Sequence, residues 1–230
     1  MTILAIDTAT EGCSAALLLP DRLLERFVEL ERGHSERILG MVDELLAESG
    51  LTLAELDAIA FGRGPGAFTG VRLAAGVTQG LAYGANRLVV PVSDLRAVAQ
   101  QALDLVPRAG AALVCNDARM KEVYWGCFTR DKDGIARAAS SEHVGAPETV
   151  ELPPGLPGEI HGAGRGFRAY PALAARLGVK LAAVHATLLP RAREIARIAE
   201  VERLAGNALP PEQALPVYVR DDVARPAPRH

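Results

Sequence analysis

The chain repeats one order of apolar segments, and this repetition restricts its fold more than any other feature. Residues 2–8 form a short apolar run containing an acid near its end, and residues 111–117 form a second such run. In each half, further strand-like segments follow and then alternate with segments of helical period. We expect two halves of order β-β-β-α-β-α-β-α, an N-terminal lobe of residues 1–107 and a C-terminal lobe of residues 108–230. Three hairpin-connected strands followed by alternating helices and strands predict an α/β fold with mixed sheets covered by helices.

The remaining elements follow from the changes of period along the chain. Strand patterns cover residues 12–19, 56–62, 88–92, 123–128, 135–144, 159–162 and 179–184. Helical patterns cover residues 35–49, 70–84, 93–105, 165–177 and 190–204, with Pro190 in the first turn of the last of them. Residues 23–30 fit a third strand, although their pattern leaves a helix open. The proline-rich segment 147–158 stops any helix that begins at Pro147.

The carboxyl ends of the first strands are where chemistry is expected. In open α/β sheets ligands gather at those ends, so Asp7 and Asp117 should face a shared cleft between the halves. Small and hydroxyl-bearing residues follow Asp7, and they would let backbone amides point outward toward a phosphate. An equally good interpretation is a tight hairpin in which Asp7 accepts hydrogen bonds from amides of the turn.

The glycine-rich segment 62–70 follows a strand and opens a helix, so its amides could hold an anion. It lacks the Gly-Lys-Ser/Thr ending of a P-loop. It half-matches a dinucleotide fingerprint, but Pro65 is awkward there and no acid stands about 20 residues further on. We interpret the segment as a shaped loop that sets a tight strand-to-helix crossing.

Composition favours a soluble protein that does not bind nucleic acid by itself. The formal net charge is −3, from 25 basic and 28 acidic side chains. Phosphate neutralisation supplies most non-specific affinity for nucleic acid, so free-standing binders usually carry a basic excess. The N-terminus does not resemble a signal peptide and no run of 18 apolar residues occurs, so we expect a cytoplasmic protein without a membrane span. The cysteines form no CxxC pair and are expected to be reduced core thiols: Cys13, Cys115 and Cys127.

Motifs for metal binding and for serine nucleophiles are weak. The histidines are dispersed without HxxxH or HxxH spacing. No G-x-S-x-G elbow occurs.

The helix expected after residue 70 carries Gly76, Gly80 and Gly84 on one face with Arg72. Each glycine costs roughly 1 kcal/mol of helix stability relative to alanine. Another backbone must therefore come close along this face, either the protein's own sheet or a helix of another chain. The apolar stripe of helix 35–49 is wide enough to pack on the protein's own sheet and on a helix of another chain.

Three segments, residues 3–11, 62–72 and 117–125, look like the signatures of the bacterial TsaB (YeaZ) family, and residues 216–220 resemble that family's ending. The likeness covers nearly the whole chain, and the Arg-Gly-Pro-Gly-x-Phe-Thr-Gly loop is highly specific. The residues that match the family motifs, and that would form any vestigial nucleotide site, are Asp7, Thr8, Thr10, Gly64, Pro65, Gly66, Thr69, Gly70, Asp117, Arg119 and Glu122.

The resemblance implies an actin-like (ASKHA, ribonuclease H-like) fold shared with sugar kinases and Hsp70-type ATPases. It also implies a role in making threonylcarbamoyladenosine at adenosine 37 of tRNAs that read codons beginning with A. There, TsaB-like proteins are non-catalytic partners of the transferase TsaD, beside the ATPase TsaE and an enzyme that makes threonylcarbamoyl-AMP. The resemblance further implies that the chain has no cofactor or metal of its own, binds ATP or ADP weakly at best, and meets tRNA only through the complex.

One departure separates this chain from the catalytic relative. TsaD-type proteins carry a His-x-Glu-x-His metal motif where residues 94–98 here read Asp-Leu-Arg-Ala-Val. Val98 cannot coordinate a metal, and Arg96 would repel a dication. The second lobe also has Asp117-Ala118-Arg119 where kinase relatives have a glycine-rich phosphate turn. The glycoprotease label of the superfamily should therefore not be carried over.

On this basis we expect helices 35–49 and 70–84 to pack against the matching helices of TsaD in a four-helix contact, and to form a homodimer when TsaD is absent. The expected interface residues are Ile38, Leu39, Val42, Leu46, Arg72, Gly76, Val77 and Gly80. The tail after residue 210 could return to the first lobe. The alternative functions are an independent ATP-dependent phosphotransferase of the sugar-kinase type and, with less support, a metallopeptidase.

Overall fold

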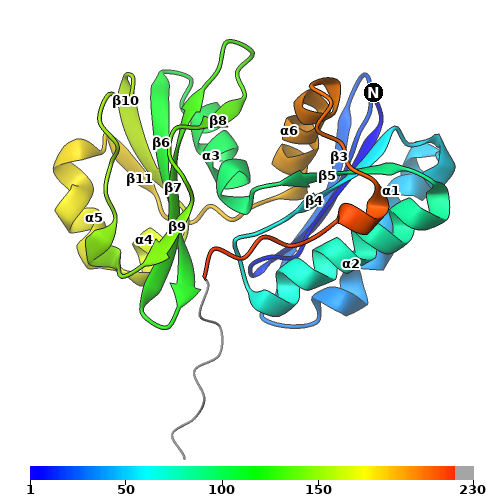
Figure 1. Cartoon of the computed structure of the whole chain (residues 1–230), viewed down its shortest axis with the longest axis horizontal. Coiled ribbons are helices and arrows are strands. Elements are labelled where there is room, and N and C mark those ends of the chain that lie inside the picture. Colours follow the sequence, from blue (N-terminus) through cyan, green and yellow to red (C-terminus); the bar gives the residue numbers. More distant parts are fainter. Residues whose placement is uncertain (221–230) are drawn as a thin grey trace, which may run out of the picture.

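A computed structural model of the chain describes residues 1–220, and it has two lobes with the same strand order (Figure 1). In the first sheet the spatial order is β3-β2-β1-β4-β5, with β1–β2 and β2–β3 antiparallel and β1–β4 and β4–β5 parallel. Its strands are β1 (Ile3–Asp7), β2 (Gly12–Leu18), β3 (Leu23–Glu29), β4 (Ala58–Gly62) and β5 (Leu88–Val92). Residues 23–30 are thus mainly a strand.

The second sheet repeats this order as β8-β7-β6-β10-β11, again with an antiparallel half and a parallel half. Its strands are β6 (Ala109–Arg119), β7 (Glu122–Arg130), β8 (Ala136–Ala138), β9 (His143–Gly145), β10 (Glu159–Ala163) and β11 (Ala183–His185). The predicted α/β class and the duplicated, actin-like arrangement are confirmed. The strand expected over residues 135–144 is instead the two short strands β8 and β9, which both pair with β7.

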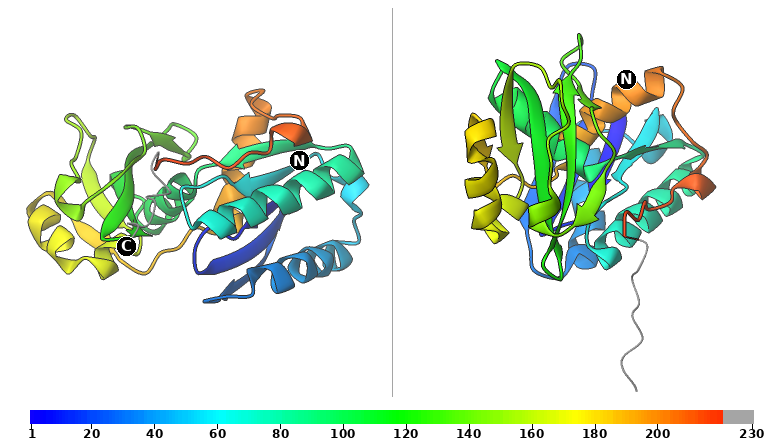
Figure 2. Two further views of the ribbon diagram at one scale, coloured as in Figure 1. Left: turned by 60° about the horizontal axis from the view of Figure 1, so that its bottom comes forward. Right: turned by 60° about the vertical axis from the view of Figure 1, so that its left-hand side comes forward.

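Helices cover both faces of each sheet. The helices are α1 (His34–Ser49), α2 (Phe68–Ala85), α3 (Asp94–Leu105), α4 (Gly166–Ala169), α5 (Pro171–Leu177) and α6 (Ala192–Leu204). In the first lobe α1 and α2 pack on one face and α6 on the other (Figure 2), because alternate residues of β1 point to opposite sides: Leu4 and Ile6 toward α1 and α2, Ile3 and Ala5 toward α6. In the second lobe α3 covers one face and the short helices α4 and α5 cover the other.

The two lobes exchange one helix each, which a division of the chain near residue 107 does not anticipate. The first half ends with α3, yet α3 packs on β6 of the second sheet, with Leu95 and Val98 in the core beside Ala112 and Val114. The second half ends with α6, yet α6 packs on β1, β2, β4 and β5 of the first sheet. The assignment of these two helices to the lobes nearest in sequence is therefore wrong. The amphipathic pattern of a helix shows which of its faces is buried, but not which sheet that face packs on.

Three further boundaries differ from expectation. The helix expected over residues 165–177 is divided into α4 and α5, with Pro171 in the first turn of α5. Residues 178–180 form a 3₁₀ turn, and β11 begins only at Ala183. Pro190 lies before α6 and not in its first turn, since the helix begins at Ala192, whose amide donates to Ser14 Oγ at 2.9 Å.

The tail returns to the first lobe. Leu209 pairs with Val89 of β5 as an isolated bridge, and the amide of Val217 donates to the carbonyl of Arg63 at 2.7 Å. Cys13, Cys115 and Cys127 are free and buried, as expected. Among the described residues, none of the helices combines the length and the apolarity needed to cross a bilayer.

The glycines of α2 fall into two kinds. A Cβ on Gly70 would lie 2.1 Å from the carbonyl oxygen of Thr8, so this position must be glycine for α2 to approach the turn after β1. Gly76, Gly80 and Gly84 are exposed, and a Cβ on any of them would meet no atom within 4 Å. The protein's own sheet is therefore not the close neighbour that would explain these three glycines.

The same substitution should have opposite effects at these two kinds of position. Gly76→Ala should raise the free energy of unfolding by about 1 kcal/mol, because alanine favours the helix and the space is open. Gly70→Ala should lower it by about 1–3 kcal/mol, because the methyl group would collide with backbone. Urea unfolding of both variants measures the two changes, and destabilisation by Gly76→Ala would show that this face is packed.

Candidate functional site

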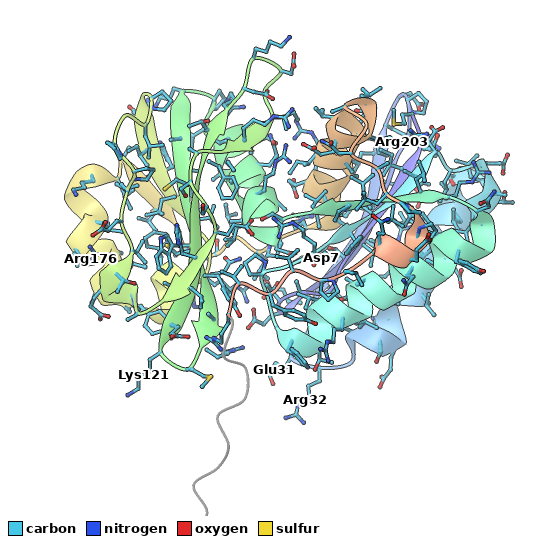
Figure 3. All side chains as sticks on the ribbon, in the orientation of Figure 1. Asp7, Glu31, Arg32, Lys121, Arg176 and Arg203 are labelled. Carbon is cyan, nitrogen blue, oxygen red and sulfur yellow. The ribbon has the colours of Figure 1, made fainter. Side chains whose placement is uncertain are left out.

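The carboxyl ends of the central strands meet between the lobes, where the structure holds two adjoining cavities of about 430 and 360 Å³. Both are lined by Thr10 and Glu11 from the first lobe and by Asn116 and Asp117 from the second. Figure 3 shows Asp7 between the lobes, but this side chain is fully buried beneath the cavities and lines neither of them. The expected shared cleft therefore exists, with Asp117 on its wall and Asp7 below its floor.

Asp7 forms a buried acid pair with Asp94, the first residue of α3. Asp7 Oδ1 accepts a hydrogen bond from the amide of Ala9 at 2.9 Å, and Asp94 Oδ2 accepts one from the amide of Gly64. Within residues 1–220 the other oxygen of each carboxyl group has no hydrogen-bond partner, and a Cβ on Gly62 would lie 2.4 Å from Asp94 Oδ1 and 2.6 Å from Asp7 Oδ1. The two carboxyl groups therefore meet at Gly62, and a proton on Asp94 would remove the repulsion between them. Asp7 thus serves the turn, as the hairpin interpretation holds.

Burial raises the pKa of both carboxyl groups in this pair. Desolvation raises the pKa of Asp7 to about 6, although hydrogen bonds from Asp94 and Ala9 oppose the shift. Burial also raises the pKa of Asp94 well above its usual range, and the neighbouring Asp7 charge adds to the effect. Two carboxylates in contact cannot both ionise without a large cost.

The glycine-rich loop packs against the turn after β1. The amide of Ala67 donates to the carbonyl of Ala9 at 2.7 Å, and Thr8 Oγ1 donates to the carbonyl of Gly70 at 2.7 Å. A Cβ on Gly66 would lie 2.4 Å from the same Ala9 oxygen. The amides of Gly64 and Ala67 are therefore engaged within the protein, and the loop holds a tight strand-to-helix crossing.

Ion pairs connect the two lobes beside the cleft. Arg119, in the β6–β7 turn, contacts Glu11 of the first lobe at 2.8 Å and Asp117 at 3.2 Å. Arg165 contacts Glu29 at 2.5 Å, and Arg220 of the tail pairs with Glu122. The guanidinium of Arg119 is largely exposed, so its ion pairs contribute little to stability.

The expected interface residues are divided between core and surface. Ile38 and Val42 are 0% and 1% exposed and pack on the first sheet, so their assignment to a partner surface is wrong. The stripe of α1 is satisfied by its own sheet. Leu46 and Val77 are half-buried, whereas the residues that face solvent are Leu39, Arg72, Gly76 and Gly80.

Exposed aromatic side chains extend this surface, and the sequence reasoning missed them. The guanidinium of Arg72 lies over the Phe68 ring at 3.7 Å, and its Nε donates to the Tyr218 hydroxyl at 2.6 Å. Tyr83, further along α2, is 79% exposed. In a chain with 4% aromatic residues, their placement on helical positions outside the apolar stripe was the available signal.

The positions that the resemblance aligns with a metal motif have other roles. Arg96 forms an ion pair with Glu202 at 2.8 Å and donates to the carbonyl of Ala136 at 2.6 Å, while Val98 is fully buried. Within residues 1–220, no three or more His, Cys, Asp or Glu side chains are grouped so as to hold a metal ion.

The acid pair gives stability a defined pH dependence. Its folded-state pKa values lie above the ordinary value of 3.8, so from roughly pH 4 to 6 the folded chain binds more protons than the unfolded chain and the free energy of unfolding falls as pH rises. Asp94→Asn removes the titrating group of Asp94, and with it the share of this contribution that comes from the raised pKa of Asp94. The stability of the variant relative to wild type should therefore increase over this range.

Urea unfolding of both proteins at several pH values measures this difference. Burial also raises the pKa of Glu194 to about 8, but that contribution is common to both proteins and cancels. A difference that stays constant with pH would contradict the raised pKa of Asp94.

Comparison with known proteins places the chain in a family. A family model described as TsaD, tRNA N6-adenosine threonylcarbamoyltransferase, matches residues 28–217. The tRNA threonylcarbamoyladenosine biosynthesis protein TsaB of Escherichia coli is 43% identical over 97% of this chain and 96% of the relative, and the protein of the same name from Haemophilus influenzae is 39% identical over 97% and 95%.

Solved structures point to the same family. The structure of YeaZ from Pseudomonas aeruginosa superposes with a TM-score of 0.85 at 44% identity, over 94% of this chain and 99% of that one. Similarity of this extent, in sequence and in fold, means that the chain belongs to the TsaB (YeaZ) family.

Proposed function

We propose that the chain acts in the biosynthesis of threonylcarbamoyladenosine in tRNA, as a non-catalytic subunit that binds a TsaD-type transferase. The observation that carries the proposal is the similarity, over nearly the full length of both chains, to relatives named as biosynthesis proteins of this modification. As the resemblance implies, the target is adenosine 37 of tRNAs that read codons beginning with A, and TsaE is a further component.

The interior of the cleft supports an accessory role. Asp94, Arg96 and Val98 stand where the transferase family carries its metal ligands, and here they serve an acid pair, an ion pair and the core. Amides of the glycine-rich loop are engaged by Asp94 and Ala9. These contacts argue against an independent phosphotransferase, which would need such groups to hold Mg²⁺ and nucleotide.

The outer face of α1 and α2 supports binding of another chain. We define this face as Leu39 and Gly40 of α1 with Phe68, Arg72, Gly76, Gly80 and Tyr83 of α2, all of them exposed. Phe68, Leu39 and Tyr83 are large apolar or aromatic groups of the kind that anchor interfaces. The open glycines would let a partner helix approach the backbone of α2 closely.

A TsaD-type chain fits this face because the two families share a fold. The TsaD family model matches this chain across α1 and α2, so the partner carries equivalent helices at equivalent positions. Two like surfaces can pair around a pseudo-twofold axis, and the same face would pair with itself in a homodimer when the partner is absent. The net charge of −3 agrees with tRNA being held mainly by other subunits.

A larger side chain at one of the open glycines of α2 should weaken binding of the partner without lowering the stability of the chain. Gly80→Gln places a long side chain in open space on a helix that tolerates it, so the free energy of unfolding should not fall. Affinity for the TsaD-type partner, measured by calorimetric titration, should drop at least about tenfold.

Ala175→Gln is the matched control, because Ala175 is exposed on α5 of the other lobe. It should leave affinity unchanged. Equal affinities of wild type and Gly80→Gln would place the interface elsewhere, while leaving the biosynthetic assignment standing.

A further inference from the structure

The tail of the chain, residues 209–220, is bonded to the side of α2. In Figure 1 it runs from beside α2 toward the second lobe. Gln79 Nε2 donates to the carbonyl of Pro211 at 3.2 Å, and Arg72 Nε donates to the Tyr218 hydroxyl at 2.6 Å. Because both donors belong to α2 and lie about two turns apart, the tail is held in a fixed position along this helix.

Between the tail and α2 lies a groove of about 400 Å³, which we call the tail groove. Its walls include side chains of α2 and of the tail: Arg72, Gly76, Gln79, Leu215, Pro216 and Tyr218. None of the residues that line the two cavities of the cleft lines this groove, so it is a separate surface. It is continuous with the outer face of α1 and α2, because Arg72 and Gly76 belong to both.

Apolar side chains of the tail are exposed to solvent at this groove. Leu215 is 63% exposed and Tyr218 is 43% exposed, and the Phe68 ring, also exposed, lies 5.8 Å from that of Tyr218. Half of the ten exposed large hydrophobic side chains within residues 1–220 lie on the tail or next to it: Phe68, Met120, Leu215, Val217 and Tyr218. Such a concentration of exposed apolar groups marks an interaction surface.

Arg72 adds a positive charge that is held in one orientation. Its guanidinium lies over the Phe68 ring at 3.7 Å and is bonded to the Tyr218 hydroxyl, and Arg72 forms no ion pair within residues 1–220. A guanidinium held in this way is suited to a carboxylate. Among the described residues the groove lining contains no acid, so pairing of the groove with itself would leave Arg72 without an anion.

We infer that the tail groove binds a segment of the TsaD-type subunit that presents a carboxylate beside an apolar side chain. The carboxylate pairs with Arg72, and the apolar side chain packs between Leu215 and the open backbone at Gly76. This occupant follows from the positive charge of the groove and from its continuity with the face that we assign to that subunit. The inference rests on the proposed function and adds the tail to a contact otherwise made by helices.

Calorimetric titration of the full chain with the TsaD-type subunit tests the role of the tail. Leu215→Ser removes an exposed apolar group, so the affinity should fall at least about tenfold while the free energy of unfolding stays the same. Leu105→Ser is the matched control, because Leu105 is 60% exposed at the end of α3 on the second lobe. It should leave the affinity unchanged.

A second variant tests the charge. Arg72→Gln removes the cation and keeps a side chain that can bond to the Tyr218 hydroxyl. The affinity should fall at least about tenfold and should depend less on salt concentration than that of wild type, because salt screens an ion pair. Arg168→Gln is the charge-matched control, since Arg168 is exposed on α4 of the other lobe, and it should change neither quantity.

Equal affinities of wild type, Leu215→Ser and Arg72→Gln would overturn the inference and leave the proposed function standing. Absence of binding by wild type would overturn both. Loss of self-association in Leu215→Ser, measured by sedimentation, with unchanged affinity for the TsaD-type subunit would assign the groove to a second copy of this chain and would also overturn the inference.

Discussion

The contact between the turn after β1 and the glycine-rich loop before α2 is the constraint on which the rest of the structure depends. Three glycines, Gly62, Gly66 and Gly70, stand where any side chain would strike the turn or its acid pair. Because of them, β1, β4 and the start of α2 lie within backbone contact. Asp94 ties the first turn of α3 to the same point through the amide of Gly64. Loop, turn and two helices are thereby fixed relative to one another around one buried pair of carboxyl groups.

This arrangement is consistent with the accessory role that we propose. Loop amides that could receive a phosphate are bonded to Asp94 and Ala9, and Asp7 is sealed beneath the cleft. Meanwhile α2 leaves Gly76, Gly80 and Gly84 open to solvent beside exposed aromatic side chains. The polar groups beneath the cleft are thus bonded to one another, while α2 presents exposed glycines and aromatic side chains, and both features fit the proposed accessory role.

Much of the fold and of the cleft could be predicted from the sequence, because local residue patterns determine the strands, the helices and the turns. The acid-ended strands at Asp7 and Asp117 predicted the duplicated lobes and the cleft, and the glycine loop was correctly interpreted as a tight crossing. The exchange of α3 and α6 between the lobes could not be predicted. Apolar residues such as Val98 and Ile195 define the buried face of each helix, but they do not determine which sheet that face packs on. The pairing of Asp7 with Asp94 and the exposure of Asn116 to the cavities depend on residues far apart in the chain. Periodicity also could not say that Ile38 and Val42 face inward while Leu39 faces out.

The central claim is that a TsaD-type transferase needs this chain in order to modify tRNA, while the chain itself does not catalyse the transfer. The most direct measurement is the amount of threonylcarbamoyladenosine formed in tRNA by a TsaD-type transferase, TsaE and the enzyme that makes threonylcarbamoyl-AMP, with and without this chain. The account predicts modification only when the chain is present, and none when the TsaD-type subunit is withheld. Equal modification in its absence, or modification by this chain without the TsaD-type subunit, would contradict it.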